Sequence, residues 1–170
     1  CMRLGEGVEA LVGEVRALKL DPRRVHMAAT EYYVHVAHAR LHQCLHAEPE
    51  QREQRIAQFS EALDELRRAA RVPLLLGHYR ALLAQLEWMR EEWDDAAKSF
   101  IEAERLGIQE SAPWVLYTVY RGRAHMLNAR DKPEAARDQA RLAEALARAH
   151  GAGHRVRWVR EEFGASSSID

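Results

Sequence analysis

The chain has 170 residues, with 25 lysines and arginines against 26 acidic residues and a formal net charge of −1. This balance lacks the basic excess that binds nucleic acid, and no run of 18 or more apolar residues predicts a membrane span. Alanine and leucine dominate the 47% apolar fraction and β-branched residues are few, which favours helices over sheets. We therefore expect an all-α protein.

Cysteine content and the first residues predict the compartment. The chain has two cysteines, Cys1 and Cys44, and this is not the dense framework of a small disulfide-stapled secreted domain. The first residues lack the basic flank and apolar run of a signal peptide. A cytoplasmic protein is the expectation. The start at Cys1 indicates a fragment of a longer polypeptide or a processed terminus, and the fragment is the favoured interpretation.

Prolines and glycines divide the chain into helices, and none of the five prolines interrupts an apolar period. A weaker helix that contains several glycines comes first, and a serine-rich tail predicted to be disordered comes last. The helices are predicted to begin or run at 2–20, 22–46, 51–70, 73–90, 94–107, 113 onward, 133–150 and 154–163. They form a single domain, 1–163, with three pairs at about 22–71, 73–107 and 111–150 and a capping helix at about 154–163. The tail, 164–170, follows this domain.

Particular residues predict where helices start and stop. Asp21, ahead of a proline, is predicted to be the N-cap of the second helix. Asp94 or Asp95 is predicted to cap the helix that ends at Gly107, and Gly151 is predicted to end the helix of the third pair.

The helix pairs repeat. Alignment of the second helices places Phe59, Phe100 and Ala140 in register, about 40 residues apart. Small residues recur beside them and in the first helices, which lets two backbones approach closely. These positions are Ala62, Ala103 and Ala143 in the second helices and Ala39, Ala84 and Ala124 in the first.

On these residues the sequence resembles the tetratricopeptide repeat superfamily. The middle pair carries the best match, with Leu83-Ala84, Trp93, Ala96, Phe100 and Ala103 at the family spacing. Glu87 and Ile108 depart from the family pattern, and the period is longer than the usual 34 residues. The resemblance implies a right-handed α-α superhelix, and the longer repeat looks like the C-terminal helical region of large bacterial signalling proteins.

The resemblance also implies a partner-binding groove on the first helices. Arg40 and Arg121 favour carboxylates there, and Trp88 shares a face with Gln85 and Met89 away from the leucines of its helix. The groove positions carried over from the family are Tyr33, Arg40, Gln43, His78, Gln85, Trp88, Met89, Arg121, His125 and Asn128.

Four histidines, His35, His38, His42 and His46, form one stripe on a helix. Packing against a neighbouring helix or exposure to solvent is the favoured interpretation. Metal binding by His38, His42 and His46 is the alternative, although no fixed carboxylate or thiol completes such a site. A protonation-sensitive interface is a third and weaker interpretation.

Motifs for catalysis or cofactor binding are missing from the sequence. It has no phosphate-binding loop, nucleophile elbow or paired-cysteine motif, and Cys44 falls inside a predicted helix. The acidic run 91–95 fits a turn and a helix start, and the arginines in 67–71 and 155–160 fit solvated faces or helix-end charges.

These observations predict a non-catalytic interaction module without a cofactor, in a larger cytoplasmic bacterial regulator. The expected partner is a protein, a peptide or an upstream domain of the same polypeptide. Neither nucleic acid nor membrane is expected to bind, and a homodimer is compatible with the sequence. A ligand- or metal-responsive sensor domain that uses the histidine stripe, 35–46, is the runner-up.

Overall fold

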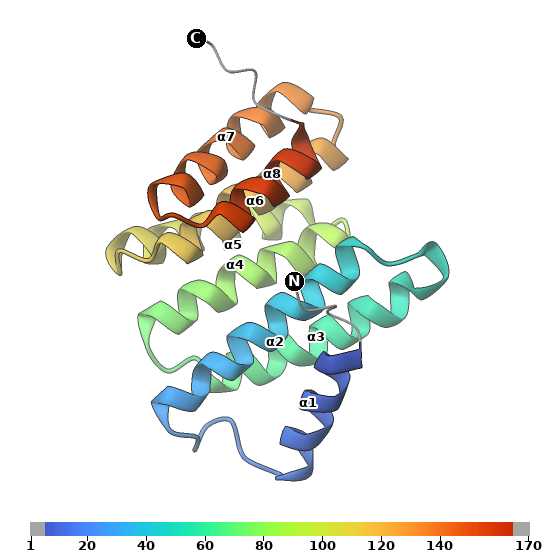
Figure 1. The fold of residues 1–170 in the computed structure, drawn as a ribbon, viewed down its shortest axis with the longest axis vertical. Helices are drawn as coiled ribbons and strands as arrows, with labels where there is room; N and C mark the ends of the chain where they lie inside the picture. Colours follow the sequence, from blue (N-terminus) through green and yellow to red (C-terminus); the bar gives the residue numbers. More distant parts are fainter. Residues whose placement is uncertain (1–5, 165–170) are drawn as a thin grey trace.

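A computed structural model describes residues 6–164 (Figure 1), so residues 1–5 and the predicted tail beyond Gly164 lie outside the described part. Within that part the chain is helical, which confirms the all-α prediction. The elements are α1 Glu6–Ala17, α2 Met27–Leu45, the 3₁₀ helix η1 Pro49–Gln51, α3 Arg52–Ala69, α4 Pro73–Met89, α5 Trp93–Gln109, α6 Pro113–Ala129, α7 Pro133–Ala149 and α8 Gly153–Phe163.

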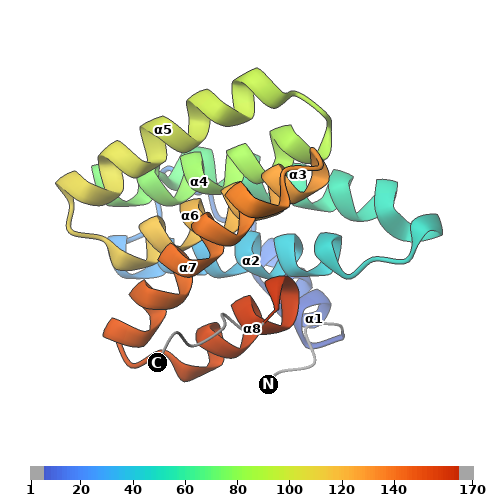
Figure 2. The ribbon, with the colours of Figure 1, turned by 90° about the horizontal axis from the view of Figure 1, so that it is seen from above.

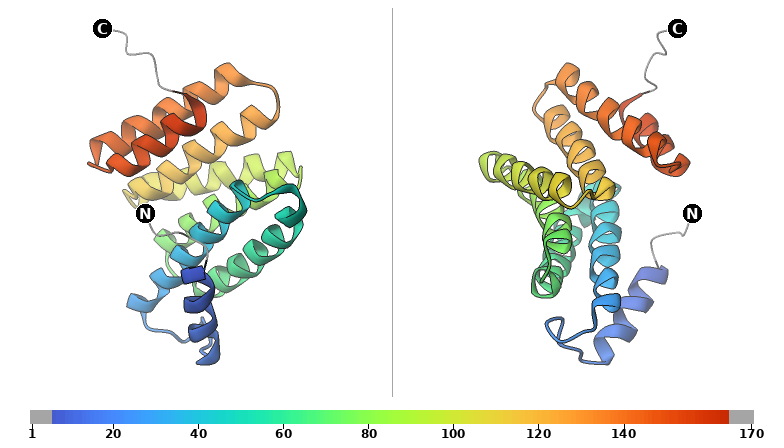
Figure 3. Two further views of the ribbon diagram at one scale, coloured as in Figure 1. Left: turned by 45° about the vertical axis from the view of Figure 1, so that its right-hand side comes forward. Right: turned by 90° about the vertical axis from the view of Figure 1, so that its left-hand side faces the viewer.

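Adjacent helices pack as pairs, α2 with α3, α4 with α5, and α6 with α7, as the sequence predicted. The first helices of the pairs also contact one another in order, α2 with α4 and α4 with α6. Seen from above, α5 lies at one edge, α1 and α8 lie at the opposite edge, and α2, α4 and α6 lie between them (Figure 2). The side view agrees, with α1 and α8 on the same side of α2 (Figure 3).

The four helices α4 to α7 are regular repeats of one length and one turn. Each has 17 residues, and each is followed by three connecting residues. The second connecting residue has a left-handed backbone, with φ of 65° at Glu91, 50° at Ser111, 57° at Asp131 and 67° at Gly151. The next amide donates to the carbonyl five residues earlier, for example Glu92 to Glu87 at 2.9 Å. This is the Schellman geometry, and it fixes a hairpin period of 40 residues in this part of the chain.

The small and aromatic residues aligned by the repeat are buried. Phe59 and Phe100 are fully buried, and Ala140, at the third position of that register, is 5% exposed. The alanines of the first and second helices are buried as well, so the close approach predicted from small side chains is present. These are Ala39, Ala84 and Ala124, then Ala62, Ala103 and Ala143.

Two predicted helix starts were misplaced. Helix α2 begins at Met27 rather than at residue 22, because Asp21 closes a local turn in which its carboxylate accepts from the Arg23 amide at 3.0 Å. The cap of α2 is His26, whose ring nitrogen Nδ1 accepts from the Ala28 amide at 3.2 Å. Helix α5 has Glu92 as its N-cap, so both predicted caps, 94–95, lie in its first turn, where their charge favours the helix dipole.

Gly107 does not end α5, as the sequence predicted, because the helix continues to Gln109. Its lack of a side chain serves helix packing instead. A Cβ atom at Gly107 would lie 2.8 Å from Cδ2 of Leu116 on α6. Gly151, in contrast, follows the end of α7 with a left-handed backbone, and the prediction for that end is confirmed.

Among the described glycines, Gly122 on α6 has the closest neighbours on other helices, and it gives a first testable prediction. A Cβ atom there would lie 1.8 Å from Nε2 of Gln85 and 2.8 Å from Cε1 of Phe100. Because Gln85 is buried and hydrogen-bonded, Gly122→Ala should lower the free energy of unfolding by about 2–3 kcal/mol, measured by urea denaturation.

The matched control is Gly13→Ala on α1, where a Cβ atom would meet nothing within 4 Å. Alanine is the better helix former by about 1 kcal/mol, so this variant should be slightly more stable than the parent. Equal midpoints for the parent and Gly122→Ala would contradict the packing described for this crossing.

Candidate functional site

The groove residues predicted on α2 are turned toward the protein itself. Tyr33 is 5% exposed and belongs to the hydrophobic core. Arg40 is 4% exposed, and its guanidinium makes a two-point ion pair with Glu9 of α1, one contact being 2.9 Å between Nη2 and Oε2. Gln43 accepts from Arg40 at 2.9 Å. In this conformation α1 therefore occupies the position that the sequence assigned to a partner carboxylate.

The groove residues predicted on α4 form a buried polar chain. The indole N–H of Trp88 donates to Gln85 Oε1 at 2.9 Å, and Gln85 Nε2 donates to the backbone carbonyl of Thr118 on α6 at 3.3 Å. Gln85 and Trp88 are 2% and 8% exposed, so they connect two helices rather than present a surface. Met89 packs against the core, and His78 is half-buried with its ring 6.1 Å from that of His38 on α2.

Two of the three groove residues predicted on α6 are bound by α8. Arg121 makes a two-point ion pair with Glu162, including 2.7 Å between Nε and Oε2, and His125 lies 3.2 Å from the same carboxylate. Burial alone would raise the pKa of Glu162, but hydrogen bonds from Arg121 and His125 hold it at about 2. The ring of Phe163 packs on His125 with 4.7 Å between centres, whereas Asn128 is exposed.

The histidine stripe of α2 is divided between two environments. The ring of His38 lies near His78, while the rings of His42 and His46 stack with 4.2 Å between centres. Trp158 of α8 lies 6.3 Å from His42, so the stripe faces both α4 and α8, in agreement with the favoured packing interpretation. In residues 6–164 no group of three or more histidine, cysteine or acidic side chains is placed to hold a metal ion.

Cys44 is buried, and burial raises the pKa of its thiol to about 11. The thiolate form, which is the nucleophile, is therefore scarce at neutral pH. This placement agrees with the interpretation of Cys44 as packing inside a helix.

The arginines of 155–160 differ from one another, although the sequence suggested solvated faces or helix-end charges for the cluster as a whole. Arg157 is exposed, and Arg160 pairs with the buried Glu144 of α7 at 2.8 Å. The Arg155 guanidinium instead lies over the rings of Trp114 and Tyr117.

The repeat period contained a signal for this position of Arg155. Residue 155 falls 40 positions after Val115 and 80 after Leu75, which are 0% and 5% exposed in the preceding pairs. The fold therefore places an arginine at a site that is apolar and buried in two earlier repeats.

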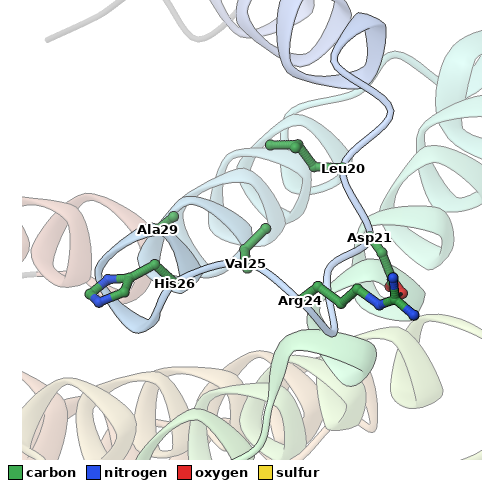
Figure 4. A pocket seen from close by; sticks show the side chains of 6 residues that line it. All are labelled: Leu20, Asp21, Arg24, Val25, His26 and Ala29. Carbon is green, nitrogen blue, oxygen red and sulfur yellow. Dashed lines mark ion pairs between the residues drawn. The ribbon is translucent and has the colours of Figure 1, made fainter.

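A cavity of about 260 Å³ opens at the link between α1 and α2 (Figure 4). In the close-up Asp21 and Arg24 lie together on one side, and His26 points away from them. The other lining residues are apolar. The ion pair in this lining joins Arg24 to Asp21, three positions earlier in the chain, at 3.9 Å. This lining holds no set of converging polar groups that would orient a small ligand. The lining residues are Leu20, Asp21, Arg24, Val25, His26 and Ala29.

Comparison with models of protein families, with curated proteins and with solved structures finds no match for this chain. Of the helices described between residues 6 and 164, none has both the length and the apolar character needed to cross a bilayer.

Proposed function

We propose that this chain is a non-catalytic interaction module, built as a right-handed tetratricopeptide-like superhelix, that binds a peptide or helix of a partner. The observation that supports this most directly is the repetition of the α4–α5 hairpin in α6–α7, with the same helix length and the same turn. Units repeated at a constant period align equivalent helices into an extended surface, and such surfaces bind other chains. The proposed setting is a larger cytoplasmic bacterial regulator.

One part of this surface that remains available is an aromatic patch made of His42, His46, His154 and Trp158. Its rings are neighbours, with 4.2 Å between His42 and His46, 6.3 Å between His42 and Trp158, and 5.2 Å between His154 and Trp158. His46 and His154 are exposed, and the other two are half-buried. Flat rings with a polar edge give a partner large contact area at low entropic cost, which makes this patch the proposed docking surface.

The proposal is tested with peptides selected by display against the whole chain. We expect selected peptides to bind the parent and to lose roughly tenfold or more in affinity on the double variant His46→Ala, Trp158→Ala, as measured by fluorescence anisotropy. The matched control replaces two exposed isoleucines of α5, Ile101→Ala and Ile108→Ala, each 64% exposed in the parent.

The control variant should bind as the parent does, because α5 lies at the edge opposite α8 (Figure 2). Melting temperatures of both variants show whether the fold is retained. Loss of binding on the α5 variant with full binding on the patch variant would contradict the proposed surface. Failure to select any binding peptide would contradict the proposed function itself.

A further inference from the structure

Arg155, in the first turn of α8, rests against two aromatic rings of α6. Its guanidinium carbon is 4.4 Å from the centre of the Trp114 ring and 4.8 Å from that of Tyr117. The Tyr117 hydroxyl donates to the backbone carbonyl of Arg155 at 3.2 Å, which ties this turn to α6. Ring contacts hold a cation through the π-face and leave its N–H donors available.

The charge of Arg155 has no compensating acid. Among residues 6–164 no carboxylate forms an ion pair with it. Glu162 of the same helix is already held by Arg121 and His125. Burial lowers the pKa of Arg155; Tyr117 opposes this shift, and the positive charge of Arg121 adds to it. A bound anion would therefore relieve an uncompensated, partly buried charge.

Two histidines, His38 of α2 and His78 of α4, lie close enough to Arg155 to feel its charge. Burial, together with positive charge that includes Arg155, lowers the pKa of His38 well below its usual value and that of His78 to about 4. Both rings are therefore neutral at pH 7, and each offers one N–H donor. The Nδ1 atom of His78 is buried and has no hydrogen-bond partner in the described part of the chain. Within residues 6–164, the Arg155 guanidinium thus has no acidic partner and His78 Nδ1 has no hydrogen bond.

We propose that Arg155, held over the rings of Trp114 and Tyr117, binds a carboxylate of an acidic partner segment. The inference rests on the proposed function, because the aromatic patch begins next to Arg155 on α8, at His154, and continues to Trp158. The guanidinium edge provides two parallel N–H donors for one carboxylate, and the two histidines, being neutral, do not compete with it for the anion. The adjacent rings then contact the apolar side chains of the same segment.

The test uses the whole chain and a fluorescein-labelled hexaglutamate peptide, with hexaglutamine as the uncharged comparison. The hexaglutamate should bind the parent more tightly than hexaglutamine does, and Arg155→Gln should weaken its binding roughly tenfold in an anisotropy titration. Arg157→Gln is the matched control, because Arg157 is exposed on the same helix, and it should change the affinity less than about twofold.

Two further measurements separate binding from folding. Hexaglutamate should shift the NMR signals of the His78 ring in the parent and in Arg157→Gln but not in Arg155→Gln, which a purely structural role of Arg155 would not predict. Arg155→Lys keeps the charge without the planar fork, so its affinity should fall between those of the parent and Arg155→Gln. Equal binding by Arg155→Gln and Arg157→Gln would overturn the inference.

Inorganic phosphate distinguishes an acidic segment from any small anion. Displacement of the peptide by phosphate at a similar concentration would overturn the assignment to an acidic segment, and retention of the peptide supports it. The display-selected peptides separate this inference from the proposed function. If they bind Arg155→Gln as well as the parent but fail on the patch variant, the inference fails and the proposed function stands.

Discussion

Phe100→Ala should lower the free energy of unfolding by about 3–5 kcal/mol, the largest effect expected from one substitution in this chain. The Phe100 side chain is fully buried in the second helix of the middle pair. It packs at the crossing with α6, where a Cβ atom added to Gly122 would come within 2.8 Å of its ring. Removal of the ring leaves a cavity that helices held by three-residue turns cannot readily close.

The neighbouring residue provides the control for this substitution. Ile101 is 64% exposed on the same helix, so Ile101→Ala should stay within about 0.5 kcal/mol of the parent. Urea denaturation followed by circular dichroism and by tryptophan fluorescence measures both variants. A loss for Phe100→Ala no greater than that for Ile101→Ala would show that the two α5 faces are assigned the wrong way round.

The ion pair between α6 and α8 should make stability depend on acid pH. Glu162 has a pKa of about 2 in the folded protein against 4.5 as its ordinary value. A carboxyl whose pKa is lowered by folding stabilises the folded state above its unfolded pKa, and that contribution is lost as the pH falls from 4.5 toward 2. The difference corresponds to about 3 kcal/mol, with little solvent screening because the Arg121 and Glu162 side chains are only 13% and 16% exposed.

Glu162→Gln tests this dependence against Glu161→Gln, since Glu161 is exposed on the same helix. The first variant should be less stable than the parent at pH 6 by about 3 kcal/mol, and this gap should narrow below pH 4.5. The second should follow the parent throughout. Hydrogen exchange of the α8 amides, measured alongside urea denaturation, reports whether the loss is confined to this helix. A gap of constant size between pH 6 and pH 3 would contradict the assignment.

Local sequence signals predicted most of the helices. Pro73, Pro113 and Pro133 each stand at the first position of a helix, as their fixed φ and missing N–H predict. The errors came where tertiary contacts competed with a local rule. Gly107 resembles a helix end in sequence, yet the chain uses it for close contact with α6. Asp21 has the features of a helix cap, but it caps a turn instead.

The candidate site was less predictable than the fold. The resemblance selected Arg40 and Arg121 as residues that favour carboxylates, and both do hold carboxylates. The acids are Glu9 and Glu162 of the same chain, however, at 31 and 41 positions away in sequence. With 26 acidic residues to choose from, no local pattern identifies these two as the partners. The choice depends on where α1 and α8 pack.

By itself the sequence determined the helical class, most helix limits and the register of the repeat, because these depend on backbone preferences and on side-chain size at short and regular spacing. Only the tertiary structure decided which polar side chains are already paired and which remain available. Arg155 shows the difference. In sequence it is one of several arginines near the C-terminus, whereas in the fold it lies half-buried over two aromatic rings, without an acidic partner among the described residues. Pairing depends on distances between helices that are remote in sequence, and packing alone fixes those distances.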